Sequence, residues 1–70
     1  MNVVNKRLLV TQGGATIVRG RIYEQTQLGD HKTRLTVKAP DGGWPTKVIV
    51  PDGLIERGSA TYKGAEFKIY

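Results

Sequence analysis

The side chains best suited to chemistry are basic and aromatic residues in two stretches, residues 17–27 and 32–39. Side chains alternate between the two faces of a β-strand, so positions of equal parity share a face. One face of the two stretches together carries Arg19, Arg21, Tyr23, Gln25, Gln27, Lys32, Arg34, Thr36 and Lys38. Cations interleaved with an aromatic ring suit a ligand that combines phosphates with flat bases.

A hairpin joins the two stretches in this interpretation, with Gly29 and Asp30 as its turn residues. On the apolar face, this register pairs Ile22 with Val37 and Glu24 with Leu35. On the other face, it pairs Arg21 with Lys38, Tyr23 with Thr36, Gln25 with Arg34 and Gln27 with Lys32. That second face holds five cations and no carboxylate. Like charges directly opposite each other are destabilising by roughly 0.2–1 kcal/mol per pair, so the row favours a polyanionic partner.

Two further interpretations of this face stay open. Cations on an exposed hairpin also protect a strand edge from aggregation, with no ligand involved. A long two-stranded ribbon can enter the major groove of duplex DNA, whereas a tyrosine ring between cations suits single strands. The sequence does not distinguish these alternatives.

The composition agrees with an anionic partner. The chain has 70 residues, with 11 Lys and Arg against 6 Asp and Glu and a formal net charge of +5. Its length fits one domain, residues 1–70, whose core supplies only a few kcal/mol of net stability. Because the chain has no cysteine that could form a disulfide, we expect a homodimer to add the missing stability.

The elements that must position these side chains are strands. Nine glycines and three prolines separate β-branched runs, at the spacing of roughly 8 to 12 residues that is typical of all-β domains. We predict strands at residues 6–11, 15–27, 32–39, 44–50, 58–63 and 65–70. The one helical alternative is a single turn at residues 52–57, capped by the side chain of Asp52. The expected fold is an all-β antiparallel barrel of five or six strands, OB-like or SH3-like, with a protruding basic hairpin.

Residues outside the hairpin are weaker candidates for a binding role. Trp44 shares its parity with Val48 and Val50, which favours a core or core-rim position over base stacking. Tyr70 is the weakest aromatic candidate because chain ends often fray. Lys47, Arg57 and Lys63 are secondary candidates for phosphate contact. The predicted nucleic-acid contacts are Arg19, Arg21, Tyr23, Gln25, Lys32, Arg34, Lys38 and Lys47.

Catalysis is not expected from this sequence. The one histidine, His31, falls in the predicted hairpin turn, the one serine is Ser59, and Asp30, Asp41 and Asp52 lie in turns. With no metal-ligand motif and no phosphate-binding loop, we expect no enzyme activity, metal, cofactor or small-molecule substrate. No apolar run approaches the roughly 20 residues of a membrane span, so we expect a soluble cytoplasmic protein without a membrane partner.

The layout of five or six strands with a long basic hairpin that carries Tyr23 resembles small OB-like barrels that bind single-stranded nucleic acid. It is most similar to the filamentous-phage gene V-type single-stranded DNA-binding proteins. In that family a protruding hairpin, the DNA-binding wing, carries basic and aromatic residues. The matching stretch is residues 18–38, with Arg19, Arg21, Tyr23, Lys32, Arg34 and Lys38 as contact residues. The resemblance implies a phage protein that works as a dimer and coats DNA cooperatively.

A protein-interaction module is the alternative function. A small SH3-like barrel binds a partner through an edge strand or an apolar surface, and Leu9, Ile17 and Ile49 fall on parities that expose them. Such an apolar interface depends weakly on salt, whereas phosphate contacts depend on it steeply.

Overall fold

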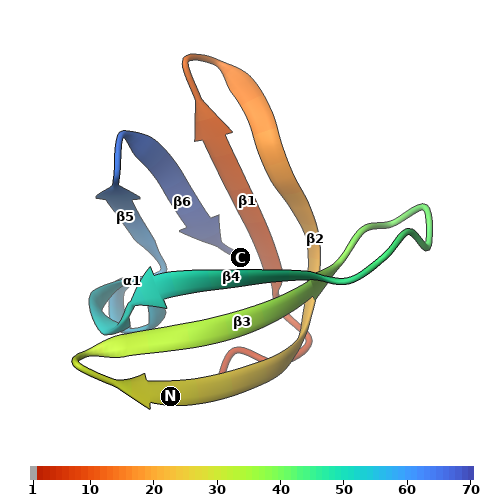
Figure 1. Cartoon of the computed structure of the whole chain (residues 1–70). Helices are drawn as coiled ribbons and strands as arrows, with labels where there is room; N and C mark the ends of the chain where they lie inside the picture. The colour runs from red at the N-terminus through yellow and green to blue at the C-terminus, as the bar shows by residue number, and fades with distance from the viewer. Residues whose placement is uncertain (1) are drawn as a thin grey trace.

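The computed structural model describes residues 2–70. Six antiparallel strands form one sheet in the order β4-β3-β2-β1-β6-β5, with one short helix (Figure 1). The elements are β1 (Arg7–Gln12), β2 (Ala15–Gly29), β3 (Lys32–Lys38), β4 (Thr46–Pro51), α1 (Asp52–Arg57), β5 (Ser59–Tyr62) and β6 (Ala65–Ile69). The all-β prediction is confirmed. The sheet is open, because β4 and β5 lie at its two edges.

The sheet bends sharply along β2, the longest strand. The first part of β2 pairs with β1 and the second part pairs with β3, so β3 and β4 run across β1 and β6 in Figure 1. Gly20 lies at the bend, where a Cβ atom would stand 2.3 Å from the carbonyl oxygen of Lys38. Only a residue without a side chain lets the end of β3 approach β2 this closely.

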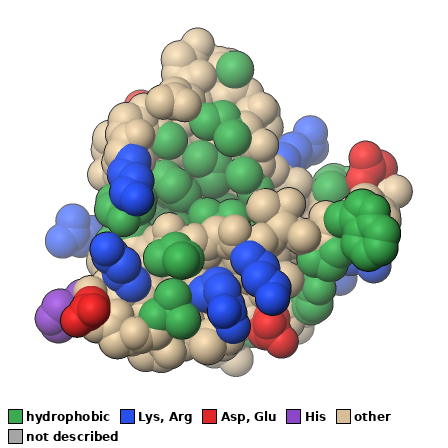
Figure 2. All heavy atoms as spheres, in the orientation of Figure 1, with side chains coloured by type: hydrophobic (Ala, Val, Ile, Leu, Met, Phe, Trp, Pro, Cys, Tyr) green, Lys and Arg blue, Asp and Glu red, His purple; other side chains and the backbone are tan. Residues whose placement is uncertain are grey.

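The core fills the inner face of the bent sheet. Apolar side chains alternate along each strand, and the buried ones are Val3, Leu8, Val10, Ile22, Leu35, Val37, Val50, Leu54, Ile55, Ala65, Phe67 and Ile69. Leu54 and Ile55 come from α1, which ends at Gly58 in a left-handed conformation. In Figure 2, hydrophobic side chains gather in a hollow over β1, β2 and β6, just above β4. The inner face is therefore partly open there.

The β2–β3 register agrees with the prediction only near the bend. Arg21 lies opposite Lys38 and Ile22 opposite Val37, but the register then shifts at Tyr23. Beyond this bulge the pairs are Glu24 with Thr36, Gln25 with Leu35, Thr26 with Arg34, and Gln27 with Thr33. The predicted pairs from Tyr23 onward are wrong, because one extra residue in a strand reverses the faces of the residues after it. A second register shift follows between Gln27 and Gly29.

The hairpin turn also differs by one residue from the prediction. Asp30 and His31 are the two turn residues, with φ of 55° and 59°, and Gly29 instead pairs with Lys32. Two consecutive left-handed residues are what a two-residue type I′ hairpin requires. Asp and His are among the side chains that adopt this conformation most readily.

The hairpin does not project as a free wing. β4 pairs with β3 along its length, from Lys32 opposite Pro51 to Val37 opposite Thr46. Asp52, predicted to cap α1, instead accepts hydrogen bonds from the Thr33 hydroxyl (2.6 Å) and the Gln27 amide (3.1 Å), while Pro51 occupies the N-cap. These two hydrogen bonds connect the first residue of α1 to the β2–β3 hairpin.

The one helix within residues 2–70, α1, is too short to cross a membrane.

Candidate functional site

A row of cations crosses the outer face of the sheet at the bend. Arg7 lies directly opposite Arg21, and Arg21 lies directly opposite Lys38, so the row runs over β1, β2 and β3. Tyr70 extends it on the far side of β1, because its backbone N–H and C=O both bond to the backbone of Arg7, at 3.0 and 2.9 Å. Three strand positions and Tyr70, which directly follows β6, thus bring three cations and one aromatic ring into line.

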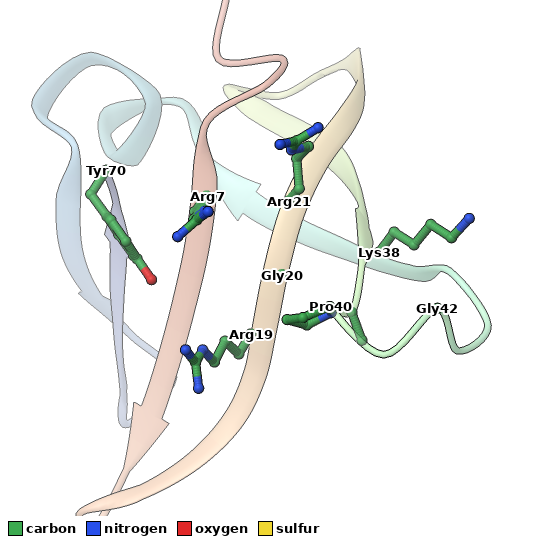
Figure 3. Close-up of a pocket in the computed structure, with 9 residues that line it drawn as sticks. Arg7, Arg19, Gly20, Arg21, Lys38, Pro40, Gly42 and Tyr70 are labelled. Atoms are coloured by element: carbon green, nitrogen blue, oxygen red, sulfur yellow. The ribbon is translucent and has the colours of Figure 1, made fainter.

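These side chains surround a hollow of about 540 Å³, here called the basic hollow. Its lining consists of Arg7, Arg19, Gly20, Arg21, Lys38, Ala39, Pro40, Gly42 and Tyr70 (Figure 3). In Figure 3 the Arg19 side chain extends from β2 toward Tyr70, whereas Lys38 extends to the other side, beyond β3. No Asp or Glu side chain contributes to the lining, and no ion pair forms between side chains within residues 2–70. No acidic side chain of the part of the chain that the structure describes therefore neutralises the positive charges of the hollow.

The loop between β3 and β4 forms one wall of the basic hollow. The N–H of Gly42 donates to the carbonyl of Ala39 (3.1 Å), and the N–H of Gly43 donates to the carboxylate of Asp41 (3.0 Å). Gly42 has a φ of 79°, a left-handed value that glycine adopts without strain. Both hydrogen bonds join residues of the loop itself, and they hold its backbone in this conformation.

Trp44, on the same loop, is 93% exposed. The predicted core or core-rim position is wrong. Strand β4 begins at Thr46, so the alternation that buries Val50 does not extend back to Trp44. The flanking Gly43 and Pro45 keep this segment outside the ladder.

A second group of cations, the distal cluster, lies on the outer face beyond the Tyr23 bulge. It consists of Lys32, Arg34 and Lys47. Arg34 is opposite Ile49, whose side chain is 50% exposed, and Figure 2 shows Lys and Arg side chains beside exposed hydrophobic ones in this region. Glu24 also faces outward here, where its carboxylate accepts a hydrogen bond from the Thr36 hydroxyl (3.2 Å). Unlike the basic hollow, this region includes an acid.

The structure separates the predicted contact residues into two groups and two single residues. Arg19, Arg21 and Lys38 line the basic hollow, and Lys32, Arg34 and Lys47 form the distal cluster. Tyr23 is 45% exposed at the bulge between them. Gln25 does not belong to the basic face, because it turns inward and its side-chain oxygen accepts a hydrogen bond from the N–H of Val3 (2.8 Å).

Two residues of the basic hollow, Arg7 and Tyr70, are not among the predicted contacts, although Tyr70 is named as the weakest aromatic candidate. Alternation in the first strand buries Leu8 and Val10 and so turns Arg7 outward, a signal that the sequence contains. β1 and β2 form a hairpin, but its register shifts between Val10 and Thr11, so alternation alone does not place Arg7 opposite Arg21. Tyr70 is held by two backbone hydrogen bonds rather than frayed.

The chemistry available in the hollow is anion binding. Arginine presents a planar fork of N–H donors that fits phosphate oxygens, and lysine supplies a point charge. The described lining contains no His, Ser, Thr, Asp or Glu side chain. Comparisons of the chain with family models, curated proteins and solved structures found no match, so its function is argued from its own residues.

Proposed function

We propose that the protein binds nucleic acid through the outer face of the sheet, with the basic hollow as the principal contact. One observation carries this proposal: Arg7, Arg19, Arg21 and Lys38 line one hollow that has no Asp or Glu side chain in its lining. Two of the neighbouring pairs, Arg7–Arg21 and Arg21–Lys38, are like charges directly opposite each other. Each such pair destabilises a sheet by roughly 0.2–1 kcal/mol, and phosphates bound between them relieve this repulsion.

The extent of the charge favours a polyanion over a single small anion. Neighbouring strands lie about 4.8 Å apart, so the row from Arg7 to Lys38 spans roughly 10 Å. A ligand with several phosphates along an extended backbone matches this distribution better than one isolated anion.

The test is the salt dependence of binding to a labelled oligonucleotide, measured by fluorescence anisotropy between about 50 and 300 mM salt. We expect wild-type affinity to fall steeply with salt. The double variant Arg21→Gln with Lys38→Gln removes two contacts and should reduce the salt slope by about 1.4 for single strands, since each phosphate contributes about 0.7. Its affinity should fall at least about tenfold.

A matched control removes the same charge elsewhere. Arg57→Gln with Lys63→Gln also lowers the net charge by two, but neither residue lines the basic hollow. We expect this control to retain most of the affinity. Equal losses in both double variants would contradict the basic hollow as the site, and no binding by the wild type at low salt would contradict the function itself.

Protein binding along the β4 edge is the second candidate function. β4 is an edge strand whose outer side pairs with no other strand within residues 2–70, and Ile49 on it is 50% exposed. Such an edge can pair with a strand of a partner. A complex with a protein partner that persists at about 0.5 M salt and is lost in Ile49→Ser would favour this function over nucleic-acid binding.

A further inference from the structure

We propose that Trp44 stacks on an unpaired base of the bound nucleic acid, so that the ligand is single-stranded. This inference rests on the proposed function, because the phosphates of the same strand would occupy the basic hollow. It assigns to the β3–β4 loop a binding role that the charge pattern alone does not reveal.

The exposure of Trp44 is the first observation. Its side chain is 93% exposed and forms no hydrogen bond or ring contact with other described residues. By contrast, Phe67 is buried and meets the ring of Tyr62 in an edge-to-face contact, with centroids 6.1 Å apart. A large apolar ring normally contributes to a core or an interface. Because Trp44 contributes nothing to the core, its ring is available to a ligand.

The position of Trp44 is the second observation. Gly42, two residues earlier, lines the basic hollow. Consecutive Cα atoms are about 3.8 Å apart, so the Cα of Trp44 lies within roughly 7.6 Å of the Cα of Gly42. In Figure 1 this loop projects away from the sheet, beside the bend. A strand whose phosphates enter the hollow therefore passes within reach of the indole ring.

The internal hydrogen bonds of the loop are the third observation. The Gly42 and Gly43 N–H groups are both satisfied within the loop, and Pro40 and Pro45 restrict the backbone at either end. The loop thus holds Trp44 outward with little freedom to lose on binding. Such preorganisation favours affinity.

An exposed tryptophan beside a hollow lined by arginines favours some anionic ligands over others. Bases in a duplex are stacked on both faces, whereas an unpaired base offers a free face to an aromatic ring. An anionic membrane also attracts cations and tryptophan, but a flat headgroup surface does not enter a hollow lined by Arg7, Arg19 and Arg21. The observations therefore favour a single strand over a duplex or a lipid surface.

The experiment compares a thymidine oligonucleotide of about 12 residues with an abasic strand of the same length and phosphate number. We expect the wild type to bind the thymidine strand at least about fivefold more tightly than the abasic strand. Trp44→Ala should abolish this difference and leave affinity for the abasic strand unchanged. Because Trp44 is the only tryptophan, its fluorescence should be quenched by the thymidine strand and not by the abasic one.

Controls keep this inference separate from the proposed function. Trp44→Ala should unfold at the same temperature as the wild type, because the side chain is exposed. Arg21→Gln with Lys38→Gln should weaken binding to both strands by the same factor. If the wild type binds both strands equally and Trp44→Ala changes neither, the stacking role is overturned, while the basic hollow remains supported by the double variant.

Two further probes complete the test. A duplex of the same sequence should bind more weakly than the single strand and should leave the Trp44 emission unchanged. Vesicles that contain anionic phospholipid should also leave it unchanged. A shift of Trp44 emission to shorter wavelength with vesicles, without quenching by the thymidine strand, would overturn the inference in favour of a lipid surface.

Discussion

The two basic regions of the outer face have similar charge and different surroundings. Around the basic hollow, Arg7, Arg21 and Lys38 lie side by side on three strands and no Asp or Glu side chain lines the hollow. In the distal cluster, the cations share the surface with Glu24 and with an exposed Ile49. Opposed cations without an acid are unfavourable for folding alone, so the basic hollow is the region whose composition indicates a ligand.

The difference between the two regions comes from local backbone geometry. Gly20 lets the end of β3 approach β2, which brings Lys38 beside Arg21. Only a few residues further along β2, the bulge at Tyr23 turns Glu24 outward and Gln25 inward. A single inserted residue therefore decides which side chains accompany the cations.

Gly20→Ala should have the largest effect, because it disturbs the bend that brings the cations of the basic hollow together. The new Cβ would lie 2.3 Å from the carbonyl oxygen of Lys38 and 2.9 Å from a side-chain carbon of Val37, so β3 must move away from β2. We expect a loss of about 3 kcal/mol or more in the free energy of unfolding, measured by urea denaturation. Gly53→Ala in α1 is the control, because its Cβ would have no neighbour closer than 4.0 Å, and equal losses in both variants would contradict the role of Gly20.

Arg7→Glu should weaken oligonucleotide binding and at the same time make the fold more stable. The new carboxylate would lie opposite Arg21, so we expect the free energy of unfolding to rise by roughly 0.2–1 kcal/mol. Oligonucleotide affinity should fall at least about tenfold, because one contact is lost and a repulsion is gained.

Lys32→Glu is the counterpart in the distal cluster. It makes the same change of charge and should cost less than about threefold in affinity, because exposed charges beyond a Debye length of about 10 Å are screened at 0.1 M salt. A larger loss for Lys32→Glu than for Arg7→Glu would reverse the ranking of the two regions.

Asp52 should make the attachment of α1 to the hairpin sensitive to acid. The Thr33 hydroxyl, and more weakly the Gln27 amide, hold the pKa of Asp52 below its ordinary value of 3.8. A depressed pKa contributes stability that is present above the unfolded value and is lost as the pH falls through the folded one. From about pH 5 to about pH 2, the wild type should therefore lose more stability than Asp52→Asn in urea denaturation. Parallel losses in the two proteins would show that these hydrogen bonds do not favour the ionised form.

Glu24→Gln should have the smallest effect. The amide oxygen keeps an acceptor for the Thr36 hydroxyl, which is bonded to Glu24 in the wild type, so we expect little change in stability. Removing this acid beside the distal cluster should raise oligonucleotide affinity by about twofold at low salt. A gain much larger than this would mean that the distal cluster contacts the ligand directly.

Alternation along the strands is sufficient to predict the all-β fold and much of the core. Val18, Ile22, Leu35 and Val37 face inward as their parity indicates. The same reasoning fails beyond Tyr23, because a bulge leaves no mark in a pattern of alternating residues. It also fails at Trp44, where the predicted strand extends across Pro45 into the loop.

The composition of the basic hollow is only partly accessible from sequence. Arg19, Arg21 and Lys38 belong to one hairpin, so local pairing brings them together. Arg7 and Tyr70 come from opposite ends of the chain and join the hollow through the β1–β2 and β1–β6 pairings. The β1–β6 pairing depends on how the whole chain packs, and the β1–β2 hairpin contains a register shift between Val10 and Thr11 that alternation does not mark.

The most direct test of the central claim is a map of backbone amide chemical shifts during titration with a single-stranded oligonucleotide at low salt. The account predicts that the largest changes occur at residues 7, 19–21, 38–44 and 70, around the basic hollow and its loop. Changes confined to the hairpin tip at residues 27–34, or to the β4 edge, would contradict it.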